Sequence, residues 1–254
     1  MNSLIRFSIL CASLAISLVT EARTIEEVKA SGKLIVATET AYPPFTYTQN
    51  GVRTGLDVEL MEAVAKKMGV KVEWQVLSFD VLLVGLAQNR WDMAVSSIGI
   101  TPTRAKAVTF ANPEYCSGAV IVSKDPQVNS IATLKNKVIA VQTGTTYLPN
   151  LRAIPNVKEI KNYPKDADAI SALLAGRVDA WVSDRFSAKA AVNSMPQAGL
   201  KIGGFVLVEK LAVAVKKDNL SLANAYNKAL AEVMADGTYK KISEKYTAED
   251  VRCK

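Results

Sequence analysis

Histidine is absent from the chain of 254 residues, and this absence excludes several classes of site. Without an imidazole there is no histidine-based catalytic triad, no histidine metal ligand and no histidine general acid or base. We also expect no metal, no cofactor and no enzymatic activity. Hydrophobic residues make up 49% of the chain and charged residues 22%, so it can bury a core and is not disordered.

Long hydrophobic runs are also lacking, and only residues 7–19 form an apolar stretch of note. This stretch is too short to span a bilayer of about 30 Å. It follows the basic Arg6 and precedes residues 20–22, which place small side chains at the −3 and −1 positions of a cleavage site. We predict a signal peptide of residues 1–22, with an uncleaved anchor helix as the alternative, and an exported mature chain.

Cysteine is scarce, with three residues in the whole chain. Cys11 lies in the predicted signal peptide, and the bulky Leu10 before it is not typical of a lipidation site. In an oxidising compartment the remaining pair, Cys116 and Cys253, can form a disulfide. Such a bridge would contribute about 4–5 kcal/mol in the chain-entropy model. The sequence leaves open whether the pair is bonded or consists of two free thiols.

Positive charge exceeds negative charge by seven, and the balance is unchanged when Arg6 and Glu21 are removed with the signal peptide. The lysines are scattered along the expected helices and form no basic cluster. We therefore expect no nucleic-acid partner and a solvated surface with some preference for anionic partners.

Apolar, β-rich runs alternate with helical patterns throughout the chain, which predicts an α/β fold with mainly parallel sheets and helices on both faces. Residues 57–68 carry apolar side chains at helical spacing, and a long helix is expected from Leu220 to a stop at Gly237. The expected strands are residues 34–38, 70–75, 91–95, 137–141, 157–160 and 178–183.

One pattern, L-x3-R-x-D-x2-V-S, occurs twice, in residues 86–96 and 173–183. Each copy combines the end of a helix, a tight turn and a strand that ends in polar residues. The recurrence predicts two similarly built lobes, with chance similarity as the alternative. Ligands of open α/β sheets bind outside the carboxyl ends of the strands. We therefore expect residues 96–97 and 183–184 to face one another across a cleft.

Two stretches offer groups that suit a carboxylate. Thr101 and Pro102 are typical of a helix start, which places Arg104 in the first turn, where its guanidinium can hold a carboxylate by two hydrogen bonds. Residues 142–146 form a turn between a strand and a helix, and its amides and threonine hydroxyls suit an anion. Its spacing is not that of a phosphate-binding loop.

Other polar and aromatic side chains complete a recognisable set. Asp184 ends an expected strand and can pair with an ammonium, although it is equally suited to capping the next helix. Tyr42 and Phe79 can form an aromatic slot, with core packing as the alternative. A carboxylate clamp, an ammonium partner and an aromatic slot together match an α-amino acid.

Several stretches resemble the signatures of one family. Residues 55–60 read GLDVEL, and residues 100–115 contain I-T-x-x-R followed by F-x-x-P-x-Y. Residues 236–239 read DGTY, with Lys245 and Tyr246 after them. Over essentially the whole mature sequence, the chain resembles the amino-acid-binding members of the family 3 periplasmic solute-binding proteins.

The resemblance implies a two-lobed fold of the type II periplasmic-binding-protein kind, each lobe a mainly parallel sheet flanked by helices, with a two-strand hinge. Lobe 1 is expected to comprise residues 23–114 and 207–254, and lobe 2 residues 115–206. The hinge crossings are expected near residues 115–118 and 204–208.

The resemblance also implies a role for each candidate residue. Arg104 and Thr146 would hold the ligand carboxylate, and Asp184 the α-amine. Tyr42 and Phe79 would sandwich the side chain, and its subsite would be lined by Glu39, Ser96, Ser97 and Gln142. Many relatives carry a hydroxyl or acidic residue where this chain has Gly99, so only a backbone group can serve the amine there.

Ligand identity depends mainly on Glu39. Residues 37–45, which read ATETAYPPF, resemble the corresponding stretch of arginine-binding relatives. A carboxylate in a desolvated slot favours a cation that can hydrogen-bond to it. Arginine is therefore favoured, followed by lysine, ornithine or a guanidino compound. A neutral ligand such as glutamine, which would donate its amide to Glu39, is the alternative.

We expect a periplasmic monomer that captures the amino acid by hinge closure and delivers it to an inner-membrane ABC permease. One alternative is an amino-acid sensor that acts in trans. Another is a lyase of the cyclohexadienyl dehydratase type. A lyase would need an acid–base group in the cleft, where Glu39 is the one spare candidate and Ser187 stands in place of a catalytic carboxylate.

Overall fold

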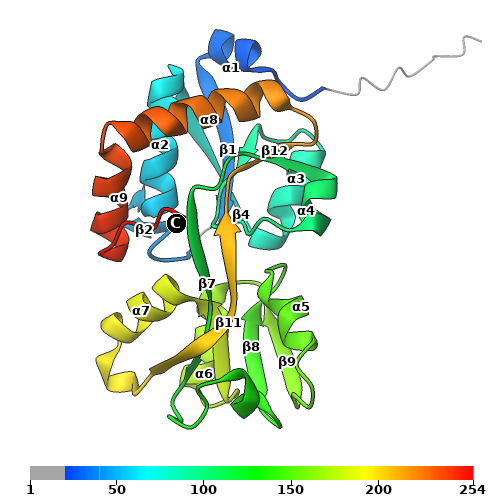
Figure 1. Ribbon diagram of the computed structural model, residues 1–254, viewed down its shortest axis with the longest axis vertical. Helices are drawn as coiled ribbons and strands as arrows, with labels where there is room; N and C mark the ends of the chain where they lie inside the picture. Colours follow the sequence, from blue (N-terminus) through cyan, green and yellow to red (C-terminus); the bar gives the residue numbers. More distant parts are fainter. Residues whose placement is uncertain (1–20, 40, 254) are drawn as a thin grey trace, which may run out of the picture.

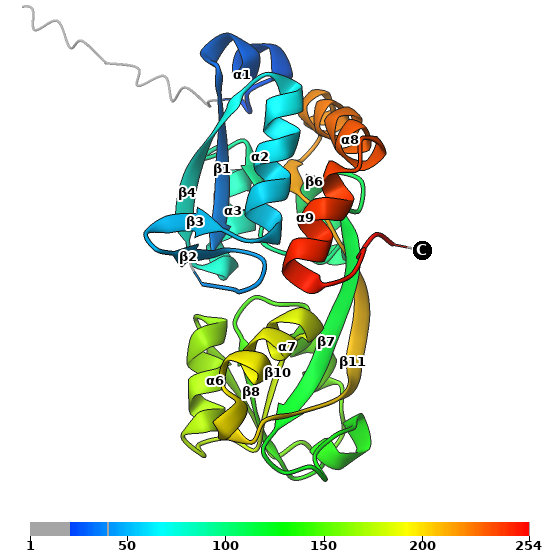
Figure 2. The same cartoon turned by 90° about the vertical axis from the view of Figure 1, so that its left-hand side faces the viewer.

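Two five-stranded sheets divide the protein into two lobes, which lie one above the other in Figures 1 and 2. The computed structural model describes residues 21–39 and 41–253. The signal peptide predicted over residues 1–22 lies almost wholly outside the described residues, so it stays a prediction. Among the described helices, none is long and apolar enough to cross a membrane.

Lobe 1 contains the sheet with strand order β4-β1-β5-β12-β6. Its strands are β1 (Lys33–Glu39), β4 (Lys71–Leu77), β5 (Met93–Ala94), β6 (Val108–Phe110) and β12 (Ala214–Lys216), beside a hairpin of β2 (Tyr47–Gln49) and β3 (Val52–Thr54). Its helices are α1 (Ile25–Ser31), α2 (Leu56–Met68), α3 (Leu82–Ala87), α4 (Pro102–Ala107), α8 (Leu220–Ala235) and α9 (Thr238–Thr247), with a 3-10 turn η1 (Phe79–Val81) before α3.

Lobe 2 contains the sheet with strand order β11-β7-β10-β8-β9. Its strands are β7 (Tyr115–Ser123), β8 (Val138–Gln142), β9 (Glu159–Tyr163), β10 (Ala180–Asp184) and β11 (Lys201–Leu211). Its helices are α5 (Tyr147–Arg152), α6 (Asp166–Leu174) and α7 (Arg185–Ser194), with 3-10 turns η2 (Ile131–Leu134) and η3 (Pro196–Ala198). All six strands predicted from the sequence are present in the two lobes, with ends shifted by up to three residues.

Each sheet has four strands running in one direction and one reversed strand, which confirms the prediction of mainly parallel sheets. In lobe 1, β1 is parallel to β4 and β5, and β12 is antiparallel to both of its neighbours. In lobe 2, β8 is parallel to β9 and β10, and β7 is antiparallel to both of its neighbours. When the strands are followed from β4 in lobe 1 and from β9 in lobe 2, the two sheets have the same topology.

The repeated sequence pattern occupies equivalent positions in the two lobes, as α3–β5 and α6–β10. Its aspartate has the same task in each copy. The Asp92 carboxylate accepts a hydrogen bond from the backbone N–H of Ile35 at 2.7 Å, and the Asp179 carboxylate accepts one from Val138 at 2.7 Å. In both lobes the aspartate therefore ties its own strand to the start of the neighbouring parallel strand.

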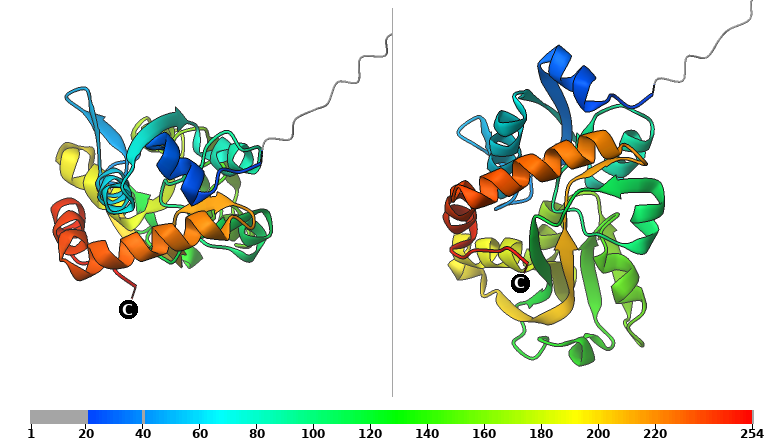
Figure 3. Two further views of the ribbon diagram at one scale, coloured as in Figure 1. Left: turned by 90° about the horizontal axis from the view of Figure 1, so that it is seen from above. Right: turned by 45° about the horizontal axis from the view of Figure 1, so that its top comes forward.

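The core of lobe 1 is packed between its sheet and the helices α2 and α8. The apolar face predicted for α2 is buried, and so is an apolar stripe of α8 that comprises Leu222, Tyr226, Ala229, Leu230 and Val233. Helix α8 crosses lobe 1 and leads into α9, as Figure 3 shows. Gly237 has a positive φ of 79° between the two helices, which explains why a glycine ends α8.

Strands β7 and β11 connect the lobes and pair along their length, from Ser123 with Lys201 to Tyr115 with Leu211. The second crossing, expected near residues 204–208, lies within β11, which continues to Leu211. A disulfide joins Cys116 on β7 to Cys253 in the C-terminal segment. The pairing that the sequence left open is therefore formed.

Candidate ligand-binding site between the lobes

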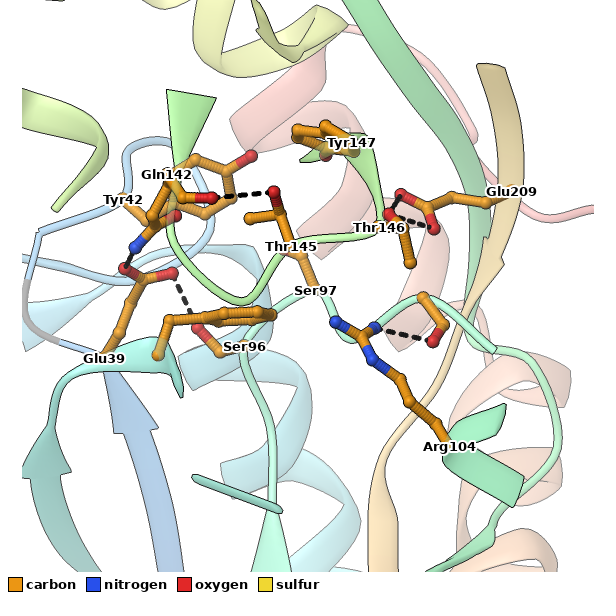
Figure 4. Close-up of a pocket in the computed structure, with 12 residues that line it drawn as sticks. Glu39, Tyr42, Ser96, Ser97, Arg104, Gln142, Thr145, Thr146, Tyr147 and Glu209 are labelled. Carbon is orange, nitrogen blue, oxygen red and sulfur yellow. Dashed lines mark hydrogen bonds between the residues drawn. The ribbon is translucent and has the colours of Figure 1, made fainter. Parts of the chain in front are cut away.

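A narrow polar cavity lies between the lobes at the carboxyl ends of their strands (Figure 4). All the residues predicted for the site line it except Asp184. Thr145 of the predicted anion-binding turn completes the wall together with Tyr147 and Glu209, which the sequence analysis did not assign to the site. The full lining is Glu39, Tyr42, Phe79, Ser96, Ser97, Gly99, Arg104, Gln142, Thr145, Thr146, Tyr147 and Glu209.

Glu39 ends β1 and points into one end of the cavity, where it is 3% exposed. Its carboxylate accepts hydrogen bonds from Ser96 Oγ in its own lobe at 3.0 Å and from Gln142 Nε2 in the opposite lobe at 2.7 Å. Burial raises the pKa of Glu39 to about 7, and these two hydrogen bonds act against the rise. The strand ends of both lobes thus meet at this carboxylate.

A buried aspartate on α2 positions the neighbouring polar loop. Asp57 accepts hydrogen bonds from the backbone N–H of Ser97 at 2.7 Å, from Ser97 Oγ at 3.2 Å and from Tyr115 Oη at 2.6 Å. These bonds hold Ser97 at a positive φ of 48°, an uncommon conformation for a residue with a side chain. Asp57 belongs to the GLDVEL motif, which therefore supports the cavity wall.

Arg104 lies in the first turn of α4, where Thr101 Oγ1 accepts a hydrogen bond from its backbone N–H at 3.1 Å. Its guanidinium donates to the carbonyl of Gly99 in lobe 1 at 2.7 Å and to the carbonyl of Gly144 in lobe 2 at 2.9 Å. Burial lowers the pKa of Arg104, and the nearby Glu209 acts in the opposite sense. Because a guanidinium has five N–H donors, it can bind a carboxylate while it keeps both carbonyls.

Asp184 ends β10 and is not among the residues that line the cavity. It is 1% exposed, and its carboxylate caps α7 by accepting a hydrogen bond from the backbone N–H of Phe186 at 2.8 Å. Burial raises its pKa to about 7, and the hydrogen bond from the backbone of Phe186 acts against the rise. The helix-capping alternative is confirmed through one carboxylate oxygen, and the role of Asp184 as an ammonium partner stays a prediction.

Glu209 is the charged residue of the lining that the sequence analysis missed. It projects from β11, and its carboxylate accepts hydrogen bonds from Thr146 Oγ1 at 2.8 and 3.0 Å. Burial raises its pKa, while Thr146 and Arg104 act to lower it. Glu209 lies one residue beyond the expected hinge crossing, and this was the only indication in the sequence that it could be near the cavity. No local sequence pattern shows which side chain of the hinge faces the cavity.

The lobes are closed on one another around this cavity. Direct hydrogen bonds cross the cleft from Gln142 to Glu39 and from Arg104 to Gly144, and Ser187 Oγ donates to the carbonyl of Pro43 at 2.7 Å. Two α/β lobes of equal topology, a two-stranded hinge and a polar cavity between the strand ends define a bilobal solute-binding protein.

Comparison with known proteins gives the family. Residues 34–249 match the family model of the bacterial extracellular solute-binding proteins, family 3, and the chain belongs to this family.

Relatives support the assignment over most of the chain. The "Probable amino-acid-binding protein YxeM" of Bacillus subtilis is 36% identical over 85% of this chain and 83% of its own. The "L-cystine-binding protein TcyJ" of Escherichia coli is 30% identical over 95% of this chain and 92% of its own. Among solved structures, "An ancestral arginine-binding protein bound to arginine" is 38% identical, with a TM-score of 0.81 over 85% of this chain and 98% of that one.

Proposed function

We propose that the protein binds a cationic L-amino acid, arginine above all, in the periplasm and delivers it as a monomer to an inner-membrane ABC permease. The observation that carries this proposal is the buried carboxylate of Glu39. Its hydrogen-bond donors, Ser96 and Gln142, are both uncharged, and among the described residues no lysine or arginine forms an ion pair with it. A buried carboxylate without a counter-ion is costly, so a cationic ligand side chain would stabilise it.

The charge of the whole cavity agrees with this ligand class. Its charged lining residues are Arg104, Glu39 and Glu209, which give a net charge of −1 when all three are ionised. Arginine or lysine carries a net charge of +1, so the complex would be neutral. The ancestral arginine-binding protein supports the same class. TcyJ is named for a neutral amino acid, so the binding experiment must distinguish a neutral ligand from a cationic one.

Binding is expected to proceed by hinge closure. The ligand first contacts one lobe, and the opposing groups then draw in the second lobe, which shifts a pre-existing equilibrium between open and closed forms. Arg104 and Glu39 suit this step because each already forms hydrogen bonds across the cleft. Closure also removes water from the cavity, which strengthens charge-assisted hydrogen bonds.

The surroundings of Ser187 also fit a binding role better than a lyase activity. Its hydroxyl donates to the carbonyl of Pro43, and it is not among the residues that line the cavity. The relatives reported above are named as binding proteins. Turnover of prephenate or arogenate by the purified protein would favour the lyase, and a stable complex with a sensor-kinase ectodomain would favour a sensor.

The ligand class is tested by calorimetric titration of refolded, ligand-free protein with the common amino acids. We expect arginine to bind more tightly than glutamine. In Glu39→Gln we expect arginine to bind about 10- to 100-fold more weakly, because a neutral amide replaces a charged hydrogen-bond acceptor. Glutamine affinity should change by no more than about threefold, since it loses no charge interaction.

The matched control is Glu232→Gln, which removes a carboxylate from an exposed position of α8. It should leave both affinities unchanged. Binding of neutral amino acids alone would contradict the cationic ligand while keeping the class of protein. An arginine affinity that is insensitive to Glu39→Gln would contradict the role given to Glu39.

Arginine binding should also strengthen as the pH rises through about 7. Below its pKa of about 7, Glu39 is protonated in the empty cavity and must release a proton before it can pair with a cation. The loss of affinity should therefore approach about tenfold per pH unit below that pKa. Titrations between about pH 5.5 and 8 measure this slope, which should flatten in Glu39→Gln. An equally steep slope in the variant would assign the proton to another group.

A further inference from the structure

A second cavity, of about 320 Å³, lies between the lobes. Figure 2 shows the elements around it, α6 and α7 of lobe 2 and, above them, β2 of lobe 1. Its lobe 1 wall is formed by residues of the segment from Ala41 to Tyr47. The two cavities share no lining residue. Small-molecule sites in proteins have volumes of about 300–1,000 Å³, so the second cavity is large enough to be one.

Most of the wall of this second cavity is apolar. Its larger apolar side chains are those of Pro44, Ile170, Trp181 and Met195, and four alanines line it as well. The lining contains no lysine or arginine, so a carboxylate would find no cationic partner there. In this respect the second cavity differs from the first, whose wall contains Arg104, and it does not suit an amino acid.

Among the described residues, Asp166 is the one charged member of this wall. It is the first residue of α6 and is 6% exposed. Its carboxylate accepts hydrogen bonds from Trp181 Nε1 at 2.8 Å and from Ser183 Oγ at 3.1 Å. Both donors are uncharged, and no lysine or arginine of the described chain forms an ion pair with it. A carboxylate has about four acceptor positions, so it can accept further hydrogen bonds.

The surroundings of Asp166 leave its charge only partly compensated. Burial raises the pKa of Asp166 to about 7, and the hydrogen bonds from Trp181 and Ser183 act against the rise. The start of α6 favours a negative charge and offsets part of the cost of burial. A cation in the cavity would offset more of it, because a buried carboxylate without a counter-ion is costly. The chemical complement of this cavity is therefore an ammonium joined to an apolar body.

We propose that the second cavity binds a primary amine with an apolar body, whose ammonium contacts Asp166 and whose hydrocarbon part packs against Ile170 and Trp181. Because the wall comes from both lobes, the complete site exists only in the closed form. A bound amine would therefore favour closure. This coupling rests on the proposed function, in which the amino acid also favours closure, and it makes each ligand strengthen the binding of the other.

The test uses 2-phenylethylamine as the probe, titrated into protein saturated with arginine so that the first cavity is filled. At about pH 8 the Asp166 carboxyl is ionised and the amine is still an ammonium. The readout is the NMR signal of the Trp181 indole N–H, which donates to Asp166. We expect this signal to shift to saturation, while the indole signals of Trp74 and Trp91 stay in place.

The charge of Asp166 is tested by Asp166→Asn, which keeps an oxygen that can accept from Trp181. The variant should bind the amine about 30-fold more weakly, because the ammonium loses a charged acceptor. Asp168→Asn, an exposed change in the first turn of the same helix, is the matched control and should bind it like the wild type. The uncharged analogue 2-phenylethanol should bind Asp166→Asn and the wild type equally, within about threefold.

An unshifted Trp181 signal, or an amine affinity that is insensitive to Asp166→Asn, would overturn the inference. Asp166 would then serve only to start α6 and to hold Trp181. Ala191→Phe tests the position, because it places a large side chain in the cavity from α7. It should abolish the shift of the Trp181 signal, and a shift that persists would overturn the placement of the amine.

The coupling between the two sites separates this inference from the proposed function. The amine should bind ligand-free protein at least about fivefold more weakly than arginine-saturated protein. Equal affinities would contradict a site built by both lobes, and displacement of arginine by the amine would place the amine in the first cavity. If arginine does not bind, the proposed function fails by itself. Titration of ligand-free wild type and Asp166→Asn with the amine then still tests the second cavity.

Discussion

Arg104→Met is expected to weaken amino-acid binding by about a thousandfold, the largest binding effect of any single substitution proposed for this cavity. The guanidinium is the one cation of the lining, and truncating one member of a buried, hydrogen-bonded charge pair costs about 2–5 kcal/mol. Methionine also leaves the carbonyls of Gly99 and Gly144 without their donor. The variant therefore loses both the carboxylate partner and a hydrogen bond that closes the lobes.

Calorimetric titration of ligand-free Arg104→Met measures the effect, and thermal unfolding shows whether the variant still folds. The affinity of Arg104→Lys should lie between those of the wild type and Arg104→Met, because lysine keeps the charge but cannot form two parallel hydrogen bonds. Arg152→Met, an exposed change at the end of α5, should bind like the wild type. Retention of affinity within about tenfold in Arg104→Met would place the carboxylate elsewhere.

The fold could be predicted because its signals are local. Helix faces show as apolar spacing, and the repeat shows as one pattern in two places. Asp92 and Asp179 explain why that pattern includes an aspartate, since each ties a strand to its neighbour through a backbone hydrogen bond. The partner of each aspartate lies 57 or 41 residues away and could not be identified from the sequence, but the recurrence of the pattern in two units reveals two lobes.

The cavity could be predicted only where residues end strands or begin helices. Glu39, Ser96 and Gln142 lie at strand ends, which a sheet topology brings together. Glu209 lies within a strand, and its orientation depends on how the hinge strands pair between the lobes. Asp184 had two possible partners, and the local one, the backbone N–H two residues ahead, donates to one of its carboxylate oxygens. Choosing between such partners requires the three-dimensional arrangement.

Replacement of both cysteines, as in Cys116→Ser with Cys253→Ser, is expected to lower the free energy of unfolding by about 2–5 kcal/mol, the largest stability effect proposed here. The bridge joins residues 137 positions apart, so it removes much of the freedom of the unfolded chain. It also fastens the C-terminal segment to the hinge strand, where the backbone N–H of Cys116 donates to the carbonyl of Val251 at 3.0 Å. Val251 is buried in the core of lobe 1.

Urea unfolding of ligand-free protein measures the loss, because a bound amino acid would add stability of its own. Reduction with dithiothreitol should lower the wild type to the level of the double variant and leave the variant unchanged. If the reduced wild type and the double variant are equally stable, the loss is due to the missing cross-link and not to the serine side chains. A loss below about 1 kcal/mol would mean that the C-terminal segment stays docked in the unfolded ensemble or that strain in the native state offsets the gain. In that case β7 would be held in place by its pairing with β11 and by packing in lobe 1. The reduced protein should then still bind arginine at temperatures where it is folded.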